Sequence, residues 1–326
     1  MINSDPNRRI DHKAVSNIMN QARTDKRRHF EQHGGDAGVL LERLNEKKLE
    51  DDEWEYASHV ELGKLQRLWW MSPYQKVLAK FSGEVLILDA SEGRNLYDYY
   101  LTTFVVIDGE NKSRSVAFCI HQAQDGETFE WMFRQMDRVL KKCSMPEAIF
   151  TDQDRGIEYG VRKVWGSKFH GFCLWHIKQN IKKKLGSALQ NAFNAFMQDF
   201  MEVYRIGSPD LFDQGWFRMM NKWSVARDYM HNELYPKRSH WAWAWVGSRF
   251  VAGTRTTGRV EGEHRIQKDM GLNRRHSPYM KRDLIFSSTF NELFEKLHER
   301  STQQHFEDYR AKCKVFPCCE KALLTL

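Results

Sequence analysis

The 326-residue sequence has no apolar run long enough to cross a membrane and no sign of secretion. No stretch approaches the eighteen or more consecutive apolar residues of a transmembrane helix. The first residues, Met-Ile-Asn-Ser-Asp-Pro-Asn-Arg-Arg, lack the apolar segment of a signal peptide. The six cysteines show no spacing typical of a disulfide framework. We therefore expect an intracellular protein in a reducing compartment, without a membrane partner.

Internal repeats and low-complexity tracts are also absent. The length is enough for one large domain or two ordinary ones. Lys and Arg number 50 against 43 Asp and Glu, a net charge of +7, which mildly favours a polyanionic partner. Eleven Trp residues suit either a helical core or surfaces that stack on nucleic-acid bases, and core packing is the commoner use.

Two short apolar runs each end in an aspartate. Residues 84–89 read Glu-Val-Leu-Ile-Leu-Asp, and residues 148–152 read Ala-Ile-Phe-Thr-Asp. Such a run fits a strand buried on both faces, although a buried helix segment has the same pattern. A carboxylate is costly to bury unless it is paired or holds a cation. If Asp89 and Asp152 lie side by side at one sheet edge, they have the geometry that a divalent-metal site needs. Caps and turn residues are the alternative reading.

The pattern from residue 85 onward predicts an RNase H-like α/β sheet. Short turns rich in Gly, Asn and Asp separate the first strand-like runs, as in antiparallel hairpins. In chain order, we expect strands over 85–89, 101–107 and 115–120, a helix over 128–143, a strand over 148–151, a helix over 157–164 and a strand over 169–173. Three strands, a helix, a strand, a helix and a strand is the element order of that fold.

The remaining segments have helical patterns. Residues 51–82 read as one or two helices, and residues 175–250 read as an almost wholly helical insertion. Arg23, Lys26, Arg27 and Arg28 could contact DNA or belong to a solvated arm. We divide the chain into a helical N-terminal region with possible DNA contact (1–76), a first core part (77–186), a helical insertion (187–254), a core part with a glutamate helix (255–285) and a helical C-terminal tail (286–326).

A third acid for the metal site is expected on a helix packed against the sheet. On a helix, Thr257, Glu261, His264 and Lys268 share one face, while Glu263 points elsewhere. Two Mg²⁺ ions can activate a nucleophile and stabilise the leaving oxygen in phosphoryl transfer, and a few carboxylates from separate elements suffice to hold them. Asp89, Asp152 and Glu261 are therefore the candidate ligands, with Asp154 as the rival of Asp152.

A Cys-x-x-His motif follows the last expected strand. Cys173 and His176 make half of a zinc site, because structural zinc needs four ligands and no second pair stands at ordinary spacing. Without zinc, the pair would fix the junction between strand and insertion, and it could touch DNA. A buried cysteine beside a histidine at a helix start is the plainer reading, and we do not expect zinc.

Two basic runs flank the expected acidic site. Lys182, Lys183 and Lys184 follow the Cys-x-x-His motif, and Arg274 and Arg275 follow the glutamate helix. Lysine and arginine beside a metal site could contact the phosphates of a nucleic acid. A solvated helix face explains the same pattern.

Four segments, in this order, resemble the Mutator-like element (MULE) transposase domain, a family of RNase H-fold DDE transposases. The segments are Leu-Ile-Leu-Asp-Ala-Ser at 86–91 with Asn95, Phe-Thr-Asp-Gln-Asp at 150–154, Cys-Leu-Trp-His-Ile-Lys-Gln-Asn at 173–180, and Arg-Thr-Thr-Gly-Arg-Val-Glu at 255–261 with His264 and Lys268. The sequence departs from the family where Ser91-Glu92 replaces Thr-Tyr and Tyr100 replaces Pro. The acids themselves are untouched.

The resemblance implies that Asp89, Asp152 and Glu261 are catalytic and bind two Mg²⁺ or Mn²⁺ ions. It also implies a structural or DNA-contact motif of Cys173, His176 and Asn180. DNA-binding candidates are Lys182, Lys183, Lys184, Arg259, His264, Lys268, Arg274 and Arg275. Many relatives carry N- and C-terminal zinc modules, but residues 1–60 have no cysteine and the tail has no Cys-x-Cys and Cys-x-His pattern. The sequence therefore predicts neither module.

The function that this resemblance implies is cut-and-paste DNA transposition. The expected partners are double-stranded DNA at the terminal inverted repeats and at the target, and a second copy of the chain on the DNA, with no small-molecule cofactor. The expected location is the nucleus. The alternative is a domesticated, transposase-derived DNA-binding regulator, similar to the FAR1-type plant transcription factors, in which cleavage is lost.

Overall fold

The computed structural model describes residues 21, 35–95, 97–141, 146–254, 256–270 and 290–315, with side chains up to 308. Arg23, Lys26, Arg27 and Arg28 lie outside this part, as do the candidates Arg274 and Arg275. Within it, none of the helices is long and apolar enough to cross a membrane.

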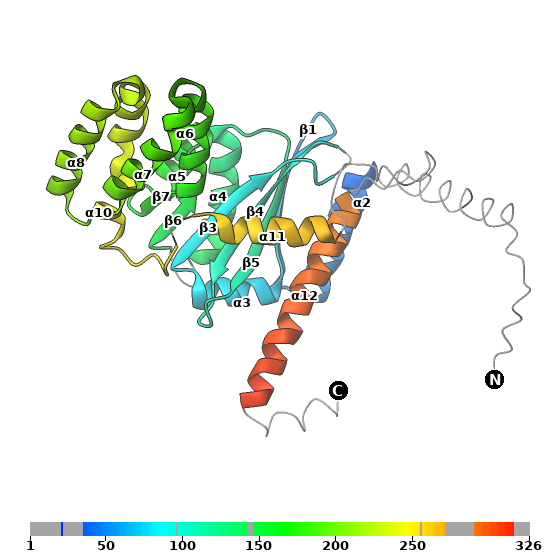
Figure 1. Ribbon diagram of the computed structural model, residues 1–326. Helices are drawn as coiled ribbons and strands as arrows, with labels where there is room; N and C mark the ends of the chain where they lie inside the picture. Colours follow the sequence, from blue (N-terminus) through cyan, green and yellow to red (C-terminus); the bar gives the residue numbers. More distant parts are fainter. Residues whose placement is uncertain are drawn as a thin grey trace, which may run out of the picture.

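The centre of the fold is a seven-stranded mixed sheet (Figure 1). Its strands in spatial order are β1 (Glu55–Glu61), β2 (Lys64–Met71), β5 (Ser113–His121), β4 (Tyr100–Ile107), β3 (Val85–Ser91), β6 (Ala148–Thr151) and β7 (Phe169–Phe172). β3 runs antiparallel to β4 and parallel to β6, which is parallel to β7. The chain passes through α4 (Gly126–Leu140) between β5 and β6 and through α5 (Arg155–Trp165) between β6 and β7. This order confirms the predicted RNase H-like α/β core.

Helices cover both faces of the sheet. On one face, α4 and α5 bury an apolar cluster that contains Leu86 and Leu88 of β3, and α3 (Pro73–Ser82) adds Ala79 to it. On the other face, α11 (Gly258–Asp269) packs Val260 against Val85 and Ile87 of the same strand. Successive side chains of a strand point to opposite faces. The apolar run of β3 therefore serves two cores at once.

The prediction of helices over 51–82 is wrong for residues 55–71, which form the β1–β2 hairpin. Leu62 and Gly63 have φ values of 48° and 73° and make the tight turn between the strands. Leu68 and Trp70 are buried in one apolar cluster, whereas Trp69 and Met71 are buried in the other. A helix cannot divide neighbouring residues between two faces in this way, and a doubly buried strand does. The predicted boundary at 76/77 therefore falls inside α3, and 1–76 is not a purely helical region.

The predicted helical insertion begins earlier than position 187. Helices follow one another from Leu174 to Val246: α6 (Leu174–Leu189), α7 (Phe193–Tyr204), α8 (Pro209–Lys222), α9 (Arg227–Tyr229) and α10 (Trp243–Val246), with short 3-10 and π turns between them. They enclose a core of their own, which contains Phe196, Phe200, Phe212, Trp216 and Trp241. In Figure 1 this block lies beside the β6–β7 edge of the sheet. Trp216 and Trp241 serve packing here, as expected, whereas Trp175 at the start of α6 is exposed.

The chain returns from the helical block to the sheet through α11 and ends its described part in α12 (Phe290–Val315). Figure 1 shows α11 lying across the sheet and α12 running beside α2 (Gly35–Glu50). Phe290, Leu293 and Phe294 of α12 share an apolar cluster with Leu40 and Leu44 of α2. The segments that precede and follow the RNase H-like core thus close over the same face of the sheet as α11.

Candidate functional site

The three predicted acids come from β3, from the end of β6 and from α11. Asp89 lies on the same face of β3 as Val85 and Ile87, because side chains alternate along a strand. The side chains of Val85 and Ile87 face α11. Asp152 directly follows β6, and by the same alternation it lies on the face of Ala148 and Phe150, which belong to the same apolar cluster as Val85 and Ile87. Parallel pairing of β3 with β6 sets both strand ends at one edge. The pleat of two adjacent strands therefore directs both aspartates towards the helix that carries Glu261.

The electrostatics of the site link Asp89 to the other two carboxyl groups. Burial, followed by the charges of Asp152 and Glu261, raises the pKa of Asp89 from 3.8 to about 7. Burial and the charge of Asp154 raise the pKa of Asp152 to about 6. Burial also raises the pKa of Glu261. Without a cation the site therefore disfavours the ionised carboxylates.

Two oxygens of this site have no hydrogen-bond donor among the described residues: Oδ1 of Asp152 and Oε1 of Glu261, both buried. Buried polar atoms of native proteins are normally paired. Oxygen atoms are also the ligands that Mg²⁺ and Mn²⁺ prefer. The residues present thus fit a divalent cation, with Asp89 as the third carboxylate of the group.

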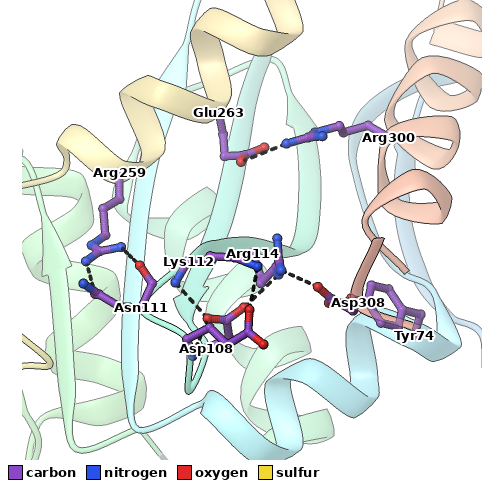
Figure 2. Close-up of polar contacts among 10 residues, drawn as sticks. Tyr74, Asp108, Asn111, Lys112, Arg114, Arg259, Glu263, Arg300 and Asp308 are labelled. Atoms are coloured by element: carbon purple, nitrogen blue, oxygen red, sulfur yellow. Dashed lines mark hydrogen bonds and ion pairs between the residues drawn. The ribbon is translucent and has the colours of Figure 1, made fainter. Parts of the chain in front are cut away.

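Asp154, the rival of Asp152, has another role. Its Oδ1 accepts hydrogen bonds from the backbone N–H groups of Gly156 at 2.8 Å and Ile157 at 3.1 Å, so it caps the N-terminus of α5. Glu263 also turns away from the site, as predicted. It accepts a hydrogen bond from Ser115 and pairs with Arg300 of α12 at 3.7 Å (Figure 2).

His264 lies inside the site and is buried. Its Nδ1 is 3.8 Å from Oδ2 of Asp89, and its Nε2 has no partner in the described part of the chain. Burial and the charges of Arg94 and Lys268 lower the pKa of His264 to about 3, so the ring is neutral at pH 7. A neutral imidazole beside Asp89 supplies no positive charge to pair with that carboxyl group.

The Cys-x-x-His motif contacts the start of the glutamate helix. Thr257, which precedes α11, donates to Sγ of Cys173 through its backbone N–H and through its hydroxyl, both at 3.1 Å. Its Oγ1 also lies 3.3 Å from Nδ1 of His176. Glu261 follows one helical turn later, and its carboxylate comes within 4.8 Å of the possible ligand atoms of Cys173 and His176. The junction of β7 and α6 thereby fixes the position of α11.

Replacing Thr257 by valine is expected to lower the free energy of unfolding by about 1–3 kcal/mol, because the buried Cys173 and His176 lose their partner. Urea denaturation followed by circular dichroism measures this change. Thr256→Val is the matched control, since Thr256 makes only a local contact with the backbone of Gly258. A Thr257 variant as stable as this control would contradict the contact's structural role.

The described basic candidates lie in three environments. Lys182, Lys183 and Lys184 are exposed on α6. Lys183 and Lys184 line a cavity of about 410 Å³ that also contains Asn180 and Gln153, the neighbour of Asp152. Arg259 instead donates to the backbone carbonyl and side chain of Asn111 in the β4–β5 turn (Figure 2). Lys268 is exposed near the end of α11. Lys183 and Lys184 thus share a cavity with the residue that follows Asp152, although none of the three acids lines it.

The carboxyl groups also predict how stability depends on pH. The folded chain retains a proton on Asp89 up to a pH of about 7, whereas the unfolded chain loses it near 3.8. The free energy of unfolding of the metal-free chain should therefore fall as the pH rises through this range. Asp89→Asn should reduce this dependence and raise the free energy of unfolding at pH 7.5 by on the order of 2 kcal/mol.

Urea denaturation in EDTA at pH 5 and pH 7.5 checks this expectation. Glu92→Gln removes an exposed acid three residues away and should keep the wild-type pH dependence. An Asp89→Asn variant with the same pH dependence as the wild type would show that Asp89 has an ordinary pKa.

Comparison with known proteins agrees with this arrangement. The family model for the MULE transposase domain matches residues 85–180, from β3 into α6, and so includes Asp89, Asp152, Cys173 and His176. Similar proteins of Arabidopsis thaliana include Protein FAR1-RELATED SEQUENCE 6, 23% identical over 67% of this chain and 31% of its own length. Protein FAR-RED IMPAIRED RESPONSE 1 is 23% identical over 74% of this chain and 29% of its own length. Protein FAR1-RELATED SEQUENCE 5 is 22% identical over 88% and 34%.

The chain thus spans about a third of the length of these relatives. The matched segment coincides with the part of the fold that the sheet order identifies as RNase H-like. The family match and the fold therefore agree over residues 85–180, the segment that is similar to the MULE transposase domain.

Proposed function

We propose that this chain is a DNA transposase that cleaves phosphodiester bonds at transposon ends and joins the freed ends to target DNA. The observation that carries the proposal is the group formed by Asp89, Asp152 and Glu261. Burial raises the pKa of all three carboxyl groups, the charges of Asp152 and Glu261 raise that of Asp89 further, and two of the carboxyl oxygens lack a hydrogen-bond donor among the described residues. A structural role explains neither feature.

In this proposal, Asp89, Asp152 and Glu261 hold two Mg²⁺ or Mn²⁺ ions, which would supply charge stabilisation and an activated nucleophile. The protein's own contribution is positional. The β3–β6 pair fixes the two aspartates, and Thr257, held by Cys173, fixes the glutamate helix. Zinc has no place in this proposal, and the Cys-x-x-His pair acts through hydrogen bonds.

The lysines of α6 would bind the DNA backbone. Lys183 and Lys184 line one cavity with Gln153, the residue that follows Asp152. Contacts of this kind bind phosphates without reading sequence. They would hold a duplex with its backbone next to the carboxylates. Transposon ends and target DNA are the proposed substrates, a homo-oligomer on the DNA is the proposed active form, and the nucleus is its proposed location.

A second candidate is a DNA-binding regulator of FAR1-like type that has lost cleavage. The observation that favours it is the set of relatives, since those named above carry FAR1-related names. The presence of all three acids in one site favours the enzyme.

A cleavage assay separates the two candidates. The purified chain is incubated with a supercoiled plasmid carrying the DNA that flanks its own coding sequence, with Mg²⁺, Mn²⁺ or EDTA, and binding to the same DNA is measured in parallel. Metal-dependent nicking supports the transposase. Binding without nicking supports the regulator, and a chain that neither binds nor nicks DNA would refute both.

A further inference from the structure

Arg94, which no sequence motif singled out, is a buried cation without an acidic partner in the described part of the chain. It lies in the loop between β3 and β4, five residues after Asp89, and only 4% of its surface is exposed. Its Nε donates to Oγ of Ser91 at 3.0 Å. No described carboxylate forms an ion pair with it, and burial lowers its pKa. Burial of a charge is unfavourable unless a partner compensates for it.

The other deeply buried arginine, Arg114, shows what a guanidinium at such a position normally has. It is 5% exposed, and it pairs with Asp108 at 3.0 Å and with Asp308 of α12 (Figure 2). The partly buried Arg300 likewise pairs with Glu263. Arg94 is buried as deeply as Arg114, yet its terminal nitrogens donate to no described residue. For Arg114 and Arg300, the described chain thus supplies an acid to the buried or partly buried guanidinium.

The position of Arg94 places this cation beside the acidic group. Ser91, to which Arg94 donates, follows Asp89 by two residues on β3 and so lies on the same face of the sheet. On α11, His264 is 3.8 Å from Asp89, and Lys268 follows it by one helical turn. The Nε2 atom of His264 is also buried without a partner. The terminal nitrogens of Arg94 and Nε2 of His264, which have no partner among the described residues, thus come from the loop after β3, the strand that carries Asp89, and from α11, the helix that carries Glu261.

We propose that Arg94 binds a phosphate group of the DNA strand that lies against Asp89, with Lys268 at the outer side of the same phosphate. A guanidinium can donate two parallel hydrogen bonds to a phosphate, which matches the two free nitrogens. Three carboxylates repel a DNA backbone, so a cation fixed beside them favours its approach. This inference rests on the DNA binding assumed in the proposed function, and it applies to the transposase and to the regulator alike.

The test measures binding without cleavage. The full chain and a fluorescein-labelled 30-base-pair duplex are titrated by fluorescence anisotropy in Ca²⁺, between about 50 and 300 mM KCl. Arg94→Gln is expected to weaken binding about tenfold at 100 mM salt and to reduce the slope of log affinity against log salt by about 1. Arg94→Lys should retain the slope. Arg134→Gln is the control, since Arg134 is exposed on α4 and pairs with Glu130.

Thermal unfolding distinguishes a binding role from a structural one. Removing a buried cation that has no partner should leave the melting temperature of Arg94→Gln equal to or above that of the wild type. A lower melting temperature, or wild-type affinity and slope in Arg94→Gln, would refute the proposed role of Arg94. A wild-type chain that fails to bind the duplex would instead refute the proposed function itself, so the two failures are distinguishable.

Discussion

Asp89→Asn is expected to abolish metal-dependent DNA cleavage, by about a thousandfold or more, while DNA binding stays within a few fold of the wild type. Asp89 is the most buried acid of the group, and its pKa responds to both of the others. The amide that replaces it keeps the shape of the side chain but carries no charge to hold a cation. Plasmid nicking in Mg²⁺ and in Mn²⁺ measures the loss, and anisotropy measures binding.

The controls for this prediction come from the same segments. Asp152→Asn and Glu261→Gln should show the same loss, because all three acids belong to one group. Glu92→Gln should cleave like the wild type, since Glu92 is exposed just beyond β3. If Asp89→Asn still nicked DNA at a rate near the wild type, this assignment of the acids would be wrong.

Trp69→Ala is expected to lower the free energy of unfolding by about 3–5 kcal/mol. Trp69 lies on β2 and is fully buried in the cluster that α4 and α5 form with the sheet. The loss of its ring removes a large apolar surface and leaves a cavity that rigid neighbouring strands cannot fill. Equilibrium unfolding in urea, followed by circular dichroism, measures the change.

Trp175→Ala provides the matched control, because Trp175 is 43% exposed at the start of α6. Its free energy of unfolding should remain within about 0.5 kcal/mol of the wild type. Near-equal stability of the two variants would mean that the β1–β2 hairpin is not an integral part of the core. The expected difference marks this hairpin as part of the same folding unit as β3.

The core of the fold could be predicted because its strands are short, apolar and punctuated by turns. The α4 face is an example: Phe129, Met132, Phe133, Met136 and Leu140 recur at helical spacing, and all are buried. The β1–β2 hairpin could not be recognised in the same way. Leu65, Leu68 and Trp69 have helical spacing, but the pairing of β2 with β5 overrides that local pattern.

The candidate site, too, could be predicted from the sequence only in part. The exits of two apolar runs indicated Asp89 and Asp152, and the spacing on one helix face indicated Glu261 and His264. The binding role of Asp154 was open from sequence, and the structure adds that one of its carboxylate oxygens caps α5. Arg94 has no sequence signal at all, because its distinguishing feature is that it is buried without forming an ion pair with a described acid.

The sequence by itself determined the parity of the strands, and with it the face on which both aspartates lie. Strand periodicity is a local property of the backbone, so it can be read without a partner. Only the tertiary structure decided which distant groups complete the site. Thr257 meets Cys173 across 84 positions, and Arg114 meets Asp308 across 194. Contacts of such separation depend on how helices dock on the sheet, which no local pattern encodes.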